Sequence, residues 1–104
     1  MGFDYGNMMK QAKMMQKRLL EIQNELKDMV FEASAGGGAV KVKVNGEQEI
    51  VEIKINKDMV SADDLEMIED MVMVAANDAI KQSREEAKSK MAGLTGGMNI
   101  PGLF

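Results

Sequence analysis

A heptad pattern near the start of the chain constrains its fold more than any other sequence feature. Apolar residues recur there at alternating steps of four and three: Met8, Ala12, Met15, Leu19, Ile22, Leu26 and Met29. At about 100° per residue, such positions line one side of an α-helix and form a stripe that packs against another helix or chain. The sequence therefore predicts a helix over residues 7–29, with Asn7 as a candidate N-cap.

The hydrophobic period then changes from the helical repeat to two, which is typical of half-buried strands. A first strand is predicted over residues 30–35, and Gly36–Gly38 should end it in a turn. Asn45-Gly46 is a strong hairpin signal, because both residues tolerate positive φ. The apolar positions of the second and third strands are Val40, Val42, Val44, Val51, Ile53 and Ile55. We expect an antiparallel meander with one apolar face and one charged face.

A second helix follows the meander. Ser61 and Asp64 have the spacing of a capping box, and the helix should run to about Met91. Asn77-Asp78 is a point where it could kink or divide. Its inward stripe is predicted to comprise Leu65, Ile68, Val72, Ala75, Ala76, Ala79, Ile80, Ser83 and Ala87.

These elements predict one α+β domain over residues 1–91: an N-terminal helix, a three-stranded antiparallel meander and a C-terminal helix that could be split in two. Residues 92–104 contain four glycines and the only proline, so we expect a flexible tail. A 104-residue chain can bury only a thin hydrophobic core. A homo-oligomer would bury additional apolar surface between its subunits. The start of the chain lacks the features of a signal peptide, and no segment is apolar enough to span a membrane, which favours a cytoplasmic protein.

Composition argues against catalysis. The chain contains no cysteine and no histidine, so it lacks the common nucleophile, general base and metal ligands. No P-loop, Rossmann or metalloprotease motif is present. The five carboxylates of residues 63–70 fit a helix start and a solvated face better than a metal cluster. We therefore expect a protein that is not an enzyme and needs no cofactor or metal.

Charge gives the clearest indication of function. The net charge is −4, yet residues 5–20 carry four bases and no acid, whereas residues 21–104 sum to −7. Lys10, Lys13 and Lys17 have the i, i+3, i+7 spacing that places them on one helical face, and Arg18 lies beside them. An anionic partner should therefore dock locally, on the first helix.

A second basic group, Lys81, Arg84 and Lys88, repeats this spacing on the last helix. If the two helices pack antiparallel, their basic ends would form one cationic patch, the footprint of phosphate-backbone binding. The alternative is that both groups are ordinary solvated faces. With one tyrosine, three phenylalanines and no tryptophan, stacking platforms are scarce, so base-specific readout is not expected.

Several segments resemble the YbaB/EbfC family of bacterial nucleoid-associated proteins. The segments are residues 7–17 (NMMKQAKMMQK), Gly38–Val42 with Asn45-Gly46, Ala75–Ala79, and Leu94–Gly97 with Pro101–Leu103. The resemblance covers nearly the whole chain and implies an α/β homodimer with projecting helices that binds DNA in the nucleoid. It places the DNA contacts on Lys10, Lys13, Lys17, Arg18, Lys81, Arg84 and Lys88, in a site completed by the folded dimer.

The function predicted is thus a homodimer that binds double-stranded DNA through backbone phosphates with little sequence specificity, and that organises the nucleoid or modulates expression. The alternative is a small acidic chaperone or adaptor. Twelve methionines, some of them off the predicted apolar stripes, suit an adaptable protein-binding surface. The order helix–hairpin–helix also resembles that of prefoldin subunits. Neither interpretation involves a membrane or a small-molecule substrate.

Overall fold

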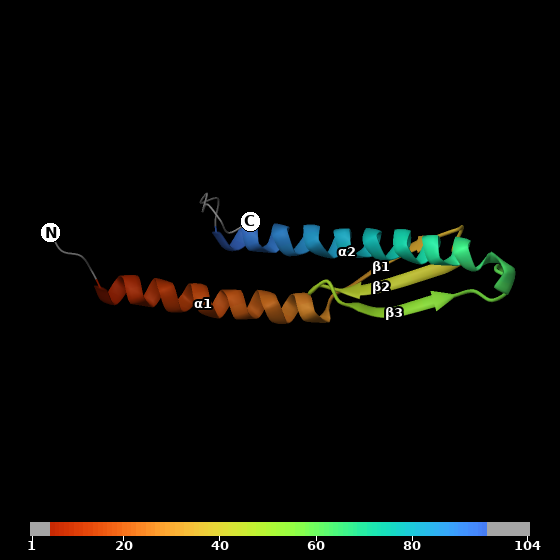
Figure 1. Ribbon diagram of the computed structural model, residues 1–104. Coiled ribbons are helices and arrows are strands. Elements are labelled where there is room, and N and C mark those ends of the chain that lie inside the picture. Colours follow the sequence, from red (N-terminus) through yellow and green to blue (C-terminus); the bar gives the residue numbers. More distant parts are fainter. Residues whose placement is uncertain (1–4, 96–104) are drawn as a thin grey trace.

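The computed structural model describes residues 5–95 and has the predicted α+β order of elements (Figure 1). Helix α1 is followed by three antiparallel strands in the order β1-β2-β3, a short 3-10 turn and helix α2. The element bounds are α1 Tyr5–Asp28, β1 Val30–Ala35, β2 Val40–Asn45, β3 Ile50–Ile55, the 3-10 turn Ala62–Asp64 and α2 Leu65–Thr95.

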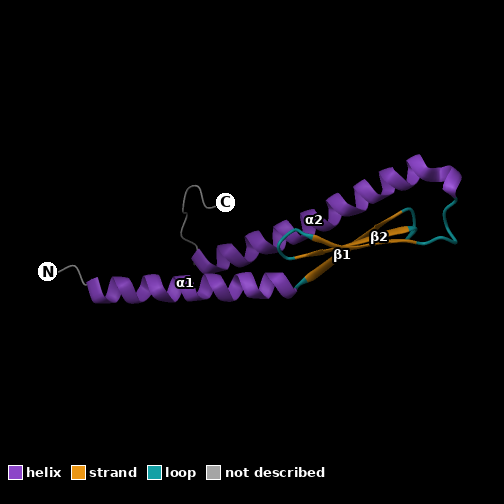
Figure 2. Ribbon diagram, turned by 60° about the horizontal axis from the view of Figure 1, so that its bottom comes forward, coloured by secondary structure: helices purple, strands orange, loops and turns teal. Residues whose placement is uncertain are grey.

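The molecule is markedly elongated. Its radius of gyration is 20.0 Å, whereas a compact chain of this length would have about 13 Å. Helix α1 projects from one end of the sheet, and α2 crosses one face of the sheet before running back beside the C-terminal part of α1 (Figures 1 and 2). The N-terminal half of α1 therefore extends beyond most of the chain.

The core lies between α2 and the first two strands. Val40, Val42 and Val44 of β2 are fully buried against Ala75 and Ala79 of α2. Small alanine side chains on α2 let the helix approach the sheet closely, and the valines fill the space between them. The predicted inward stripe of α2 is largely confirmed, with the exception of Leu65, which is 60% exposed at the helix start.

Helix boundaries differ from the sequence prediction in three places. Helix α1 begins at Tyr5, so Asn7 lies within its first turn and is not the N-cap. Helix α2 runs unbroken through Asn77 and Asp78 and continues to Thr95, past the predicted end at Met91. The rest of the predicted tail, residues 96–104, lies outside the described residues. The capping box at Ser61 is confirmed, with the Ser61 amide donating to the Asp64 carboxylate at 3.2 Å.

The β2–β3 hairpin is present, but its turn is longer than the predicted two-residue type. Neither Asn45 nor Gly46 has positive φ; Gln48 does, at +62°. The Asn45 side-chain oxygen accepts hydrogen bonds from the amides of Glu47 and Glu49, at 2.9 and 3.1 Å. The Asn45 side chain thus closes a four-residue loop. The Asn-Gly dipeptide alone does not distinguish this loop from a two-residue turn.

This hairpin joins the two helices. The Leu26 carbonyl at the end of α1 accepts hydrogen bonds from the Met29 amide at 3.1 Å and from the Gly46 amide at 2.8 Å. On the other side, the fully buried Ser83 hydroxyl of α2 donates to the Asn45 carbonyl at 2.7 Å. The orientation of α1 relative to the sheet therefore depends on close backbone contact at Gly46.

Replacing Gly46 with alanine should destabilise the fold by about 2–3 kcal/mol, the range of overpacking in a tight site. A Cβ atom there would lie 2.0 Å from the Leu26 carbonyl oxygen, so backbone would have to move. Chemical denaturation monitored by circular dichroism measures the change. Gly93→Ala is the matched control: a Cβ atom added at this position in α2 would have no neighbour within 4 Å, so the same substitution should stabilise the helix slightly. Equal stability of the two variants would contradict the assigned contact.

Candidate nucleic-acid interface

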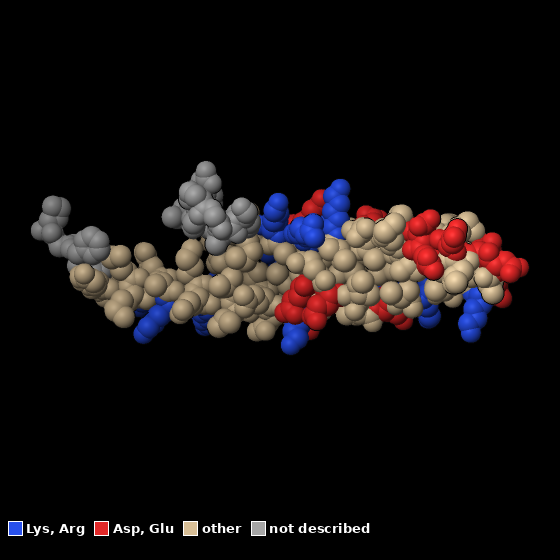
Figure 3. Space-filling model, viewed as in Figure 1, with Lys and Arg blue, Asp and Glu red and all other residues tan. Residues whose placement is uncertain are grey.

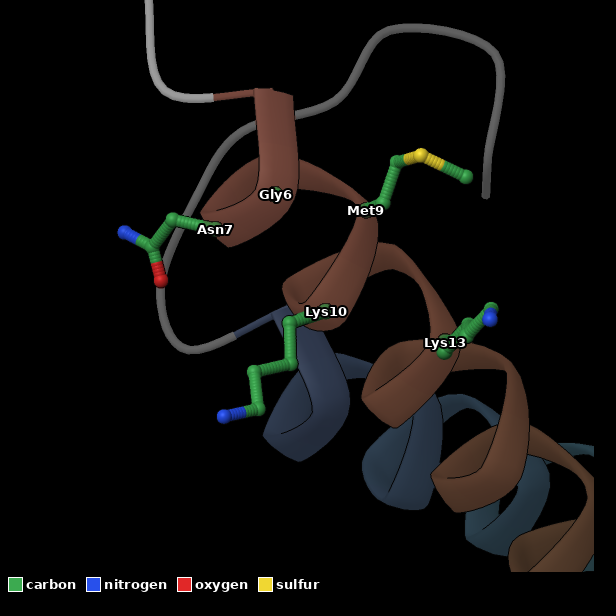
Figure 4. Close-up of a pocket in the computed structure, with 5 residues that line it drawn as sticks. All are labelled: Gly6, Asn7, Met9, Lys10 and Lys13. Atoms are coloured by element: carbon green, nitrogen blue, oxygen red, sulfur yellow. The ribbon is translucent and has the colours of Figure 1, made fainter.

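Lys10, Lys13 and Lys17, here called the α1 lysine cluster, lie on the projecting part of α1. All three are exposed, and within residues 5–95 none of them takes part in an ion pair. Figure 4 shows Lys10 and Lys13 with Gly6, Asn7 and Met9 around a shallow depression on the helix. Lys10 and Lys13 lie on the same exposed face of α1, and their side chains diverge from each other (Figure 4). The cluster is therefore accessible to an anionic partner.

Arg18 differs from its neighbours. Its guanidinium lies 3.1 Å from the Glu21 carboxylate and 3.9 Å from that of Glu25. These acids offset its charge, so a phosphate would have to compete with them. Arg18 is the weakest of the predicted contacts on α1.

Lys81, Arg84 and Lys88, the α2 basic cluster, are also exposed and have no ion pair within the described part of the chain. They flank the buried Ser83, which contacts the hairpin at the end of α1. Lys90 is not part of this cluster, because its amine pairs with Glu25 of α1 at 3.1 Å.

The two helices are antiparallel, which was the condition for a single patch, but their basic clusters are staggered. Ser83 lies at the level of the hairpin that caps Leu26, while Leu94 shares a depression with Ala12 and Met15. Lys13 lies thirteen helical steps, about 20 Å, from Leu26 at this end of α1. Figure 3 shows basic side chains of α2 along the upper edge and those of α1 along the lower edge. The expected single patch is therefore not formed within one chain.

Acidic residues gather at the opposite end of the molecule from the α1 lysine cluster. They cover the 3-10 turn and the start of α2, the red end of Figure 3. Within residues 5–95, no group of three or more histidines, cysteines or acids is placed to hold a metal ion. In the same range, neither helix combines the length and apolarity needed to cross a membrane. These acids would repel a polyanion that approached the 3-10 turn or the start of α2, whereas the α1 lysine cluster would attract it.

One feature of the sheet was not predicted. Helix α2 covers β1 and β2 but hardly reaches β3, so Ile53 and Ile55 remain 46% and 40% exposed. Both share the apolar face with Val40 and Val42, their cross-strand partners. Strand alternation identifies this face but not how many strands one helix covers, so no sequence pattern indicates the uncovered part.

Comparison with known proteins assigns the family. The model of the YbaB/EbfC DNA-binding family matches residues 1–98, nearly the whole chain. The chain belongs to the YbaB/EbfC DNA-binding family. It is 48% identical over 103 residues to a nucleoid-associated protein of Clostridium novyi, a match that covers 99% of this chain and 90% of that protein. It is 50% identical over 103 residues to one of Thermoanaerobacter pseudethanolicus, with 99% and 93% covered.

A solved structure supports the fold of this YbaB/EbfC protein. The crystal structure of an uncharacterized protein from Helicobacter pylori superposes with a TM-score of 0.79 at 26% sequence identity. The match covers 89% of this chain and 98% of that one. The resemblance found in the sequence is thus confirmed at the level of family and fold. The family is described by DNA binding and not by a catalytic activity.

Proposed function

We propose that this YbaB/EbfC protein is a homodimer that binds double-stranded DNA through backbone phosphates with little sequence specificity. The observation that carries the proposal is the α1 lysine cluster: three exposed cations that form no ion pair within residues 5–95, on a projecting helix of an otherwise acidic chain. Lysine amines act as point charges toward phosphate and do not by themselves read a base sequence. The dimer would act in the cytoplasm on the bacterial nucleoid, organising DNA or modulating expression.

The surface of the single chain supports dimerisation. Its accessible area is 7752 Å², whereas a compact chain of 11.4 kDa would expose about 5,800 Å². Part of the excess is apolar, including Ile53 and Ile55 on the uncovered part of the sheet. A second copy has the same apolar face and can cover it in a symmetric contact. A dimer would also carry two α1 lysine clusters and two α2 basic clusters, so that one duplex could meet several of them.

A salt titration of DNA binding tests the proposal. We expect log K for a 30-base-pair duplex to fall linearly with log salt, with a slope of about −5 if three lysines of each protomer meet phosphates. A duplex of scrambled sequence should bind with nearly the same affinity. Absence of binding at 50 mM salt, or a slope near zero, would refute DNA-backbone binding.

The rival function, a protein-binding adaptor, is favoured by one observation. Met8, Met9, Met14 and Met15 are all at least 42% exposed on α1, where they form an adaptable apolar surface among the lysines. An adaptor of this kind would suppress the aggregation of an unfolded client protein without salt-dependent affinity for DNA. The same purified protein can be used for both measurements.

A further inference from the structure

A third group of exposed lysines lies at the sheet, far from both helical clusters. Lys41 of β2 and Lys54 of β3 are direct cross-strand partners, and Lys57 follows the end of β3. All three are exposed, and they line one hollow together with Gly38, Ile55, Asn56 and Asp58. These three residues are here called the sheet lysine cluster.

The pairing of Lys41 with Lys54 is unusual within this sheet. Like charges directly opposite each other on neighbouring strands are destabilising, since their Cβ atoms are only about 5 Å apart. The next charged row along the same two strands avoids this cost, because Lys43 faces Glu52 and their charged groups lie 3.3 Å apart. Within residues 5–95, no acid pairs with any lysine of the sheet lysine cluster. A bound anion would remove the repulsion.

Backbone contacts bring the third lysine to the pair. The Asn56 amide donates to the Ala39 carbonyl at 2.8 Å, and the Asp58 amide donates to the Asn56 side-chain oxygen at 3.0 Å. The segment after β3 is thereby held against the turn that precedes β2, with Lys57 on the rim of the hollow. Asp58 is the one acid in the lining, so the hollow carries a surplus of positive charge.

The sheet lysine cluster remains accessible in the proposed dimer. Lys41 and Lys54 alternate with Val40, Val42, Ile53 and Ile55, so they lie on the face of the sheet away from α2 and from the apolar contact surface. Figure 3 shows basic side chains at the lower edge both beneath α1 and beneath the far end of the sheet. The two groups therefore lie toward one side of the elongated molecule.

The spacing between these groups matches DNA. From Lys13, α1 continues to Leu26, where Gly46 contacts it, and β2 leads back from the hairpin to Lys41. Because α1 and the sheet lie nearly end to end (Figure 1), this path corresponds to about 36 Å. One turn of B-DNA is about 34–36 Å long. A duplex lying along the molecule would present phosphates to both groups one turn apart.

We propose that the sheet lysine cluster binds a phosphate group of the DNA backbone and is a second contact of each protomer, in addition to α1. The proposal rests on the DNA binding proposed above. A different explanation for Lys54 is protection of the edge strand β3 from pairing with other chains. A glutamate at position 54 would also protect the edge, but it would remove the phosphate site.

The Lys54→Glu variant therefore tests the proposal. Glutamate opposite Lys41 replaces a repulsion with an ion pair, so the thermal midpoint should be equal to or higher than that of the wild type. DNA affinity should nevertheless fall several-fold, and the salt slope should become shallower by about one per protomer. Lys43→Gln, which removes a lysine already paired with Glu52 on the same face, is the control and should change the slope little.

The outcomes are separable. If the wild type does not bind DNA, the proposed function fails. If the wild type binds and Lys54→Glu has the same affinity and slope, the sheet contact is overturned while DNA binding stands. Inorganic pyrophosphate serves as a small probe: a rise in the wild-type thermal midpoint that Lys54→Glu lacks would support phosphate recognition. Such a rise with unchanged DNA binding would overturn DNA as the source of the phosphate.

Discussion

Replacing Lys10, Lys13 and Lys17 together with glutamate should abolish measurable DNA binding at 150 mM salt. Each substitution removes a candidate phosphate contact and adds a charge that repels the backbone, so the affinity should fall on the order of a hundredfold or more. The fold should survive, because the three side chains are exposed and form no ion pair within residues 5–95. A mobility-shift titration over several salt concentrations measures the loss.

A matched pair of glutamine variants separates a local effect from total charge. Lys10, Lys13 and Lys17 changed to glutamine lower the net charge of each chain by three, and so do the same changes at Lys27, Lys43 and Lys90. The second set lies outside the three basic clusters, and two of its members are paired with glutamates. Only the first set should weaken binding strongly. Equal losses would show that the overall charge, and not the α1 lysine cluster, governs affinity.

Local patterns in the sequence were sufficient to predict the elements of the fold. The heptad stripe, the alternating valines and the capping residues each act over a few neighbours. The predicted bounds of the first strand, residues 30–35, are confirmed, and the alternating Val40, Val42 and Val44 lie in β2. Of the two forms that the sequence left open for the second helix, continuous or divided at Asn77-Asp78, the structure has the continuous one, because both residues are exposed on a helix that is held by Ala75 and Ala79 on its other side. Tertiary burial thus outweighed two weak helix formers.

The arrangement of the basic residues could be predicted only in part. Their helical faces follow from spacing, and the antiparallel order of the helices follows from the short meander between them. The axial register of the two helices cannot be predicted from spacing, because it is set by the Gly46 contact with Leu26 and the Ser83 hydrogen bond to Asn45. The sheet lysine cluster was likewise not predicted from the sequence, since it is the strand register that places Lys41 opposite Lys54 and Lys43 opposite Glu52. Long-range contacts of this kind leave no periodic signal.

Replacing Ile53 and Ile55 with aspartate should convert the proposed dimer into monomers. Both side chains are on the apolar face that α2 leaves uncovered, and burying carboxylates there against a second copy would be costly without partners. Light scattering coupled to size exclusion should show a mass of twice 11.4 kDa for the wild type and of one chain for the variant. The DNA affinity of the monomer should fall by about a hundredfold, because two linked sites no longer act on one duplex.

The matched control for this change is Val30→Asp. Val30 is 59% exposed on β1, but it alternates with Phe31 and Ala33 and so lies on the charged face of the sheet. The control should stay dimeric and keep its DNA affinity, although it introduces the same carboxylate. Circular dichroism on both variants distinguishes loss of the dimer from loss of the fold. A folded Ile53→Asp/Ile55→Asp variant that remains dimeric would exclude the uncovered part of β3 as the contact surface.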